Sequence, residues 1–159
     1  MAEPAASRLA ALTAAWLANG RTLDCCSLFL TLLALAAAFF SEPPVLARAA
    51  LLLAVLLGVG EKIYAIRVAF DARIFSTWAT SWPATADFVA DAALAEFDAQ
   101  LVRLGLRSVR QQTRRGLDER IVGACALLRR QAICLALQLL AVLGAAFFLS
   151  QQSGIHYGA

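Results

Sequence analysis

Four ionisable side chains lie within or beside the long apolar stretches of this sequence: Asp24, Arg48, Glu61 and Lys62. Ionisable groups at membrane depth are costly to bury and are typical of proton relays and ion paths. These four fall near the ends of the apolar stretches rather than at their centres, which argues against transport through this chain alone. Asp24 and Lys62 are equally far along the chain from Pro43, so a helical hairpin centred there would place them at one depth. We therefore predict an ion pair between them that joins the two arms of the hairpin.

Other kinds of site find little support in the sequence. With His156 as the single histidine, neither a haem held by two histidines nor a Ser–His–Asp set is expected in the apolar stretches. Zinc is disfavoured because the cysteines form no CxxC pair and have no histidine nearby; they are Cys25, Cys26, Cys125 and Cys134. We therefore expect no catalytic residue, no cofactor and no metal, and we do not expect an enzyme.

Three apolar stretches, residues 25–41, 45–60 and 133–149, predict membrane-spanning helices. The first and third each hold 17 residues without a charge, close to the length that crosses a hydrocarbon core about 30 Å thick. The second is interrupted by Arg48, and residues 45–66 either span the membrane fully or re-enter on the same side. The predicted fold is an all-α integral membrane protein with three transmembrane helices, a hairpin plus one, and a cytoplasmic helical insert.

The distribution of charge orients these helices. Residues 61–130 hold 11 of the 14 lysines and arginines, and basic residues flank membrane spans mainly on the cytoplasmic side. The same rule explains the basic excess without nucleic acid as a partner. We expect a bacterial inner membrane, with the amino terminus in the cytoplasm and the carboxyl terminus in the periplasm. The predicted segments are an N-terminal cytoplasmic or interfacial helix (1–21), the transmembrane hairpin (22–66), the cytoplasmic insert (67–129), the third transmembrane helix (130–150) and an external tail (151–159).

Small residues at every fourth position predict where the membrane helices pack. In lipid, such faces let two helix backbones approach closely and gain van der Waals contact. The residues are Ala50, Ala54 and Gly58 in the second stretch, and Ala141 and Ala145 in the third.

Within the insert, apolar residues recur at helical spacing in two segments, and we predict that the two stripes pack on each other. One stripe is Ile66, Phe70 and Ile74, and the other is Leu94, Phe97 and Leu101. A basic rim would then stay exposed to an acidic partner or to anionic lipid headgroups. Its residues are Arg103, Arg107, Arg110, Arg114 and Arg115.

These features predict a non-catalytic integral membrane subunit or scaffold. It would lie among membrane lipids, pack against other membrane-protein subunits or copies of itself, and dock a partner through its cytoplasmic helices. One alternative is a self-assembling channel or transporter component, with a pore lined by Ser27, Thr31 and Gln138. The other is a lipid-modifying membrane enzyme that uses Glu61, Tyr64, Arg67 and Asp71.

Overall fold

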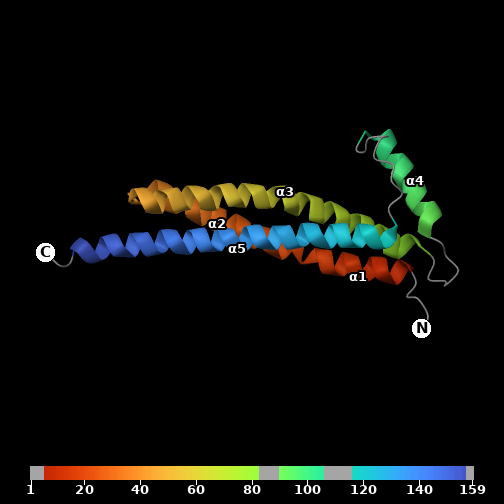
Figure 1. The fold of residues 1–159 in the computed structure, drawn as a ribbon, viewed down its shortest axis with the longest axis horizontal. Helices are drawn as coiled ribbons and strands as arrows, with labels where there is room; N and C mark the ends of the chain where they lie inside the picture. The colour runs from red at the N-terminus through yellow and green to blue at the C-terminus, as the bar shows by residue number, and fades with distance from the viewer. Residues whose placement is uncertain (1–5, 83–89, 106–115, 157–159) are drawn as a thin grey trace. The chain divides into compact units, whose positions relative to one another are not determined.

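The computed structural model describes residues 6–82, 90–105 and 116–156, with side chains up to residue 151. Within these ranges all regular secondary structure is helical (Figure 1). The helices are α1 (Ala6–Ala18), α2 (Gly20–Phe40), α3 (Val45–Ser81), α4 (Ala90–Arg103) and α5 (Leu117–His156). Three helical segments are long and apolar enough to cross a membrane: Ala6–Phe40, Val45–Ser81 and Leu117–Gln151. The all-helical class and the number of candidate spans are therefore confirmed.

Proline and backbone hydrogen bonding explain where the hairpin turns. Pro43 and Pro44 have no N–H group and cannot continue α2. Ser41 is extended, with φ −118° and ψ 158°, and its N–H closes the helix by donating to the Ala37 carbonyl at 3.2 Å. The next helix starts at once, since the Arg48 N–H donates to the Pro44 carbonyl at 2.9 Å.

The chain divides into two compact units. Unit 1 comprises Met1–Leu17 and Phe70–Ala126, and unit 2 comprises Ala18–Ala69 and Leu127–Ala159. Within unit 2, α2, the first part of α3 and the second part of α5 run side by side (Figure 1).

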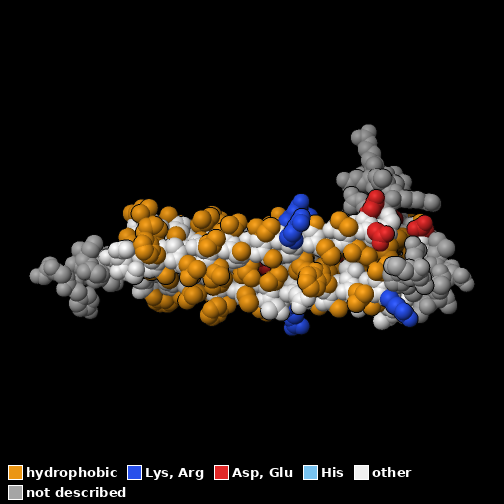
Figure 2. All heavy atoms as spheres, turned by 60° about the horizontal axis from the view of Figure 1, so that its bottom comes forward, with side chains coloured by type: hydrophobic (Ala, Val, Ile, Leu, Met, Phe, Trp, Pro, Cys, Tyr) orange, Lys and Arg blue, Asp and Glu red, His pale blue; other side chains and the backbone are white. Residues whose placement is uncertain are grey.

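Small side chains fill the apolar core of unit 2. Its buried members are Ala34, Leu51, Ala54 and Ala145, with Ala37, Ala38, Ala50, Val55, Ala141 and Val142 packed against them. Four of the five residues expected to pack the helices belong to this cluster. Most of the larger leucine and phenylalanine side chains of unit 2 are exposed or partly exposed instead, with Leu51 and Leu128 as buried exceptions. Hydrophobic side chains are spread along the face drawn in Figure 2. This arrangement suits a bundle surrounded by lipid, where close backbone approach, rather than burial of large apolar groups, holds helices together.

Aromatic rings form the core of unit 1 around Trp78. Trp78 stacks on Trp82 with centroids 5.0 Å apart, and contacts Phe75 and Phe97 edge to face at 5.2 and 5.3 Å. The Arg120 guanidinium lies 6.0 Å from the centre of the Trp78 ring and 5.8 Å from that of Phe97. These contacts hold α4 against the end of α3 and the start of α5.

An ion pair completes this aromatic cluster. Arg120 Nη2 donates to Asp98 Oδ1 at 2.7 Å, and both side chains are only 14% exposed. The pair links α4 to α5 within unit 1.

The predicted stripe of Ile66, Phe70 and Ile74 was wrong in register. Ile66 is 71% exposed and Phe70 49% exposed, whereas the buried face of α3 in this region carries Val68, Phe75 and Trp78. Apolar residues occupy both faces of this helix, so helical spacing alone could not distinguish the inner face from the outer one. On α4 the expected stripe agrees better with the structure, since Leu94 is buried and Phe97 contacts Trp78.

Replacing Arg120 with methionine should loosen α4. The variant removes the ion pair between Arg120 and Asp98, whose side chains are only 14% exposed, and breaking a buried ion pair costs about 3 to 5 kcal/mol. Hydrogen–deuterium exchange of the solubilised protein should become faster in α4 while exchange in α2 stays unchanged. The exposed Arg73 provides a matched control, since Arg73→Met should leave α4 protected. Equal protection of α4 in wild type and Arg120→Met would contradict the role given to this pair.

Candidate functional site: two polar layers inside the helical bundle

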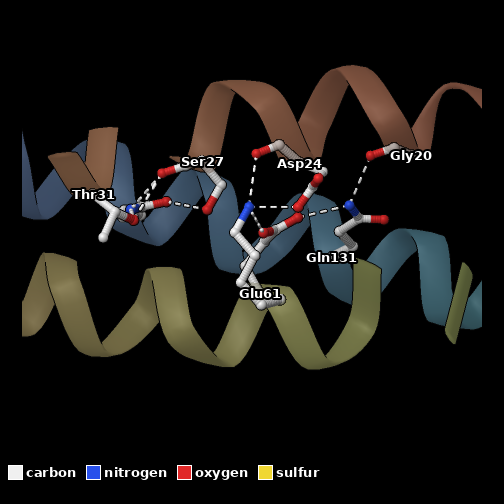
Figure 3. Close-up of polar contacts among 8 residues, drawn as sticks. Gly20, Asp24, Ser27, Thr31, Glu61 and Gln131 are labelled. Carbon is white, nitrogen blue, oxygen red and sulfur yellow. Dashed lines mark hydrogen bonds and ion pairs between the residues drawn. The ribbon is translucent and has the colours of Figure 1, made fainter. Parts of the chain in front are cut away.

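Polar side chains inside unit 2 form two layers, which follow from their spacing along the helices (Figure 3). On α5, Gln131 and Gln138 are two turns apart and therefore share one face. On α3, Gly58 and Glu61 are nearly one turn apart and also share a face. The group nearer the hairpin turn is called the Gln138 layer and consists of Ser27, Thr31, Gly58 and Gln138. The other group is called the Glu61 layer and consists of Gly20, Asp24, Glu61, Lys62 and Gln131.

The Gln138 layer is fully bonded. The Gln138 side chain accepts a hydrogen bond from Ser27 Oγ at 2.8 Å. Its Nε2 donates to the Ser27 carbonyl at 3.2 Å and to Thr31 Oγ1 at 2.9 Å. Ser27 and Gln138 are both 0% exposed. Each polar atom of the buried amide thus has a partner on α2, as a polar group in an apolar interior requires.

Gly58 lets α3 close over this layer. A Cβ atom at Gly58 would lie 2.1 Å from Thr31 Oγ1 and 2.7 Å from Gln138 Nε2, far inside van der Waals contact. Gly60, two positions further on, would meet nothing within 4 Å. The absence of a side chain at Gly58 therefore determines how closely α3 approaches α2 and α5.

In the Glu61 layer, Gln131 joins all three helices. Gln131 Nε2 donates to the Gly20 carbonyl at 2.8 Å and to Glu61 Oε1 at 2.6 Å. Glu61 and Gln131 are both 0% exposed. Gly20 permits this approach, because a Cβ there would lie 2.7 Å from Val68 Cγ1 and 3.0 Å from Gln131 Oε1.

Asp24 and Lys62 meet at the edge of the same layer. Lys62 Nζ forms an ion pair with Asp24 Oδ1 and donates to the Asp24 carbonyl at 2.9 Å. Glu61 Oε2 lies 3.5 Å from Lys62 Nζ, an ion-pair contact longer than a normal hydrogen bond. The Lys62 and Asp24 side chains are 32% and 37% exposed, so this part of the layer reaches the surface.

Two further sets of residues were named for the alternative functions, a channel or transporter component and a lipid-modifying enzyme. Ser27, Thr31 and Gln138, named as pore-lining candidates, bond to one another inside a single chain. The residues of the proposed enzymatic set differ in exposure and in the unit to which they belong. Glu61 is buried, Arg67 is exposed and Asp71 belongs to unit 1. No group of three potential metal ligands occurs among the described residues.

The remaining candidate residues lie elsewhere. Arg48 Nη2 is 3.5 Å from the Pro43 carbonyl at the opposite end of the hairpin. The four cysteines are free thiols. Arg103 is exposed at the end of α4, whereas Arg107, Arg110, Arg114 and Arg115 fall outside the described residues.

Sequence reasoning did not identify Gln131, which bonds from α5 to both α2 and α3, whereas the predicted ion pair joins only α2 and α3. A signal was present in the sequence: Gln131 and Gln138 are seven residues apart in the stretch 131–149, which is otherwise free of charged and amide side chains. That spacing indicates one polar face turned toward neighbouring helices.

No protein-family model matches this chain, and neither curated proteins nor solved structures include a similar one.

Replacing Gly58 with alanine should destabilise unit 2 by about 1 to 3 kcal/mol, the usual cost of forcing an extra methyl group into a packed interior. Gly60→Ala is the matched control. It should be neutral or slightly stabilising, because alanine favours helix over glycine by about 1 kcal/mol. Thermal unfolding of the two variants in the same detergent compares them. Equal midpoints would show that α3 does not depend on the missing side chain at Gly58.

Proposed function

We propose that this protein is a non-catalytic integral membrane subunit of the bacterial inner membrane. Its three spans pack against other membrane helices, and its cytoplasmic helices dock a partner. One observation carries the proposal: the polar groups of the bundle are used to bind its own helices together. The amides of Gln131 and Gln138 are engaged by α2 and α3, which leaves a largely apolar outer surface on unit 2 and no convergent set of reactive groups among the residues that the structure describes.

Exposed arginines support a membrane boundary next to the Glu61 layer. They are Arg21, Arg67, Arg129 and Arg130. Arg21 precedes Asp24 by one turn, and Arg67 follows Lys62 on the antiparallel α3, so both lie on the same side of the ion pair. Arg129 and Arg130 directly precede Gln131, which bonds to Gly20. The four arginines therefore occupy nearly one level.

The helix lengths beyond these arginines fit a bilayer. At 1.5 Å per residue, residues 21–40 of α2 extend about 29 Å and residues 45–67 of α3 about 33 Å. A hydrocarbon core is about 30 Å thick. The positive-inside rule then supports a cytoplasmic amino terminus and a periplasmic carboxyl terminus. The length of this part of α3 also favours a full span over a re-entrant segment for residues 45–66.

Unit 1 offers the surface for a partner. Outside the bilayer, large apolar side chains are costly to expose to water, yet Leu12 is 69%, Leu104 71% and Val122 69% exposed. Trp16 on α1 is 60% exposed. A protein partner that covers these side chains would stabilise unit 1, which is small for an independent core. The channel alternative has less support, because its proposed lining residues are already bonded within one chain.

The orientation can be tested by labelling single cysteines. In a background without the four native cysteines, Ser41→Cys and Thr77→Cys place thiols at two exposed positions, one in the hairpin turn before α3 and one near the far end of α3. A membrane-impermeant maleimide should label position 41 in intact spheroplasts, and position 77 only after the membrane is opened. Labelling of both positions from the same side would contradict a full span by α3.

Partner docking can be tested by native mass spectrometry of the gently solubilised protein. We expect a complex of fixed stoichiometry with another membrane protein or with further copies of this chain. Replacement of Arg107, Arg110, Arg114 and Arg115 by glutamine should leave insertion unchanged and remove the partner if the basic rim binds it. Arg73→Gln is the control for loss of a single exposed arginine and should retain the partner. A wild-type chain that carries lipid alone would overturn the proposed function.

A further inference from the structure

Three helices of unit 2 meet at Gly20. Gln131 Nε2 donates to the Gly20 carbonyl at 2.8 Å, and a Cβ atom at Gly20 would lie 2.7 Å from Val68 Cγ1. These three residues of α2, α3 and α5 therefore lie at the same level of the bundle. Beside each of them in the sequence is an arginine with an exposed side chain, and we call this set the arginine collar: Arg21, Arg67 and Arg130. Three positive charges thus lie at one level on the outside of unit 2.

The charge of the arginine collar is not neutralised within the part of the chain that the structure describes. Two acids lie at this level, Asp24 and Glu61, and both form ion pairs with Lys62. No described residue forms an ion pair or a side-chain hydrogen bond with a collar arginine. The N–H donors of each guanidinium group are therefore available to an anion from outside the chain.

A row of exposed apolar side chains begins beside each collar arginine and runs toward the hairpin turn. Each row lies on the same face of its helix as the arginine, because its residues follow at nearly whole helical turns. The rows are Leu28 and Leu32 on α2, Ile63 and Leu56 on α3, and Ile133 and Leu137 on α5. From Arg21 to Leu32, and likewise from Arg67 to Leu56, the distance along the helix axis is about 16 Å. One leaflet is half of a hydrocarbon core about 30 Å thick, so these two rows match its depth.

This combination of charge and apolar surface distinguishes a lipid from other anions. A soluble phosphate ion would contact the guanidinium groups and leave the apolar rows uncovered. An acidic protein segment at the cytoplasmic surface would neutralise the arginines but end where the hydrocarbon begins. A phospholipid has its phosphate at the depth of the arginines and its acyl chains at the depth of the rows. The planar guanidinium group also matches phosphate oxygens with two parallel hydrogen bonds.

We propose that the arginine collar binds anionic phospholipids of the cytoplasmic leaflet, with the headgroup phosphate on the arginines and the acyl chains along the apolar rows. Headgroups with a net negative charge are selected, because the amine of a zwitterionic headgroup competes with arginine for the phosphate. This inference rests on the membrane orientation proposed above, but it does not depend on a protein partner at unit 1.

Lipid binding at the collar should favour the assembled bundle. The three arginines come from three helices, so the collar exists only where α2, α3 and α5 are packed together. A ligand that binds the folded but not the unfolded chain stabilises the fold by mass action. The thermal midpoint of the wild type should therefore rise as the anionic fraction of the surrounding lipid increases, and it should rise less in a variant without the collar.

Native mass spectrometry of the full chain released from lipid nanodiscs tests the site. An equimolar mixture of phosphatidylglycerol and phosphatidylcholine supplies an anionic and a zwitterionic lipid with the same acyl chains. The wild type should retain more phosphatidylglycerol than phosphatidylcholine. The triple variant Arg21→Gln, Arg67→Gln and Arg130→Gln should lose this preference. The expected loss is about fivefold for each arginine removed, as for a basic residue near an anionic membrane surface.

A matched control removes the same charge from exposed positions away from the collar, by Arg8→Gln, Arg48→Gln and Arg73→Gln. It should keep the wild-type preference. Lysine at the three collar positions preserves the charge and should keep most of the preference.

Equal amounts of the two lipids on the wild type, or an undiminished preference in the glutamine variant, would overturn the proposal. An acidic protein that is lost with the collar, while the retained lipids stay unchanged, would overturn it as well. Failure of the proposed orientation is recognised separately, because positions 41 and 77 would then be labelled from the same side while the lipid preference persisted.

Discussion

The arrangement of unit 2 depends on one type of interaction: the donation of side-chain amide hydrogens by α5 to carbonyl oxygens of α2. Gln131 bonds to the Gly20 carbonyl and Gln138 to the Ser27 carbonyl, with the same separation in sequence. Two equal offsets make the helices parallel and define their axial register. Hydrogen bonds of this kind contribute only about 0.6 to 2 kcal/mol each in membrane proteins. They are directional, however, and contacts between apolar surfaces are much less so.

The helix α3 packs against α2 and α5 because its shape fits the surface that these bonds create. Gly58 leaves room for the amide of Gln138, and Glu61 accepts from Gln131. Ala54 continues the same face toward the hairpin turn, where it packs with Ala34 and Ala145. Small and polar residues therefore make up much of the interior of unit 2, and most of its large apolar residues are at least partly exposed, unlike in a water-soluble bundle.

The sequence was a good guide to features that depend on length and charge. Apolar runs, the Pro43–Pro44 break and the distribution of arginines are sufficient to predict three long helices and a hairpin. Equal distances from Pro43 also placed Asp24 beside Lys62, because a hairpin of regular helices preserves depth. Inward and outward faces were harder to predict. Where both faces of α3 are apolar, hydropathy cannot tell whether Ile66 or Val68 is the buried residue. The inner face is defined by the side chains of the neighbouring helices that pack against it.

The parallel alignment of α2 and α5 has a consequence for biosynthesis. A helix that entered lipid alone with Gln131 and Gln138 unbonded would carry two unsatisfied amides, each costing several kcal/mol in hydrocarbon. The hairpin is synthesised first, so the Gly20 and Ser27 carbonyls are already in place when α5 follows. Each of these carbonyl oxygens can accept a second hydrogen bond in addition to the one within its helix. The last span would thus leave the translocation machinery beside a finished template. Assembly in the membrane would follow the order of the chain, with the hairpin guiding the insertion of the helix that completes it.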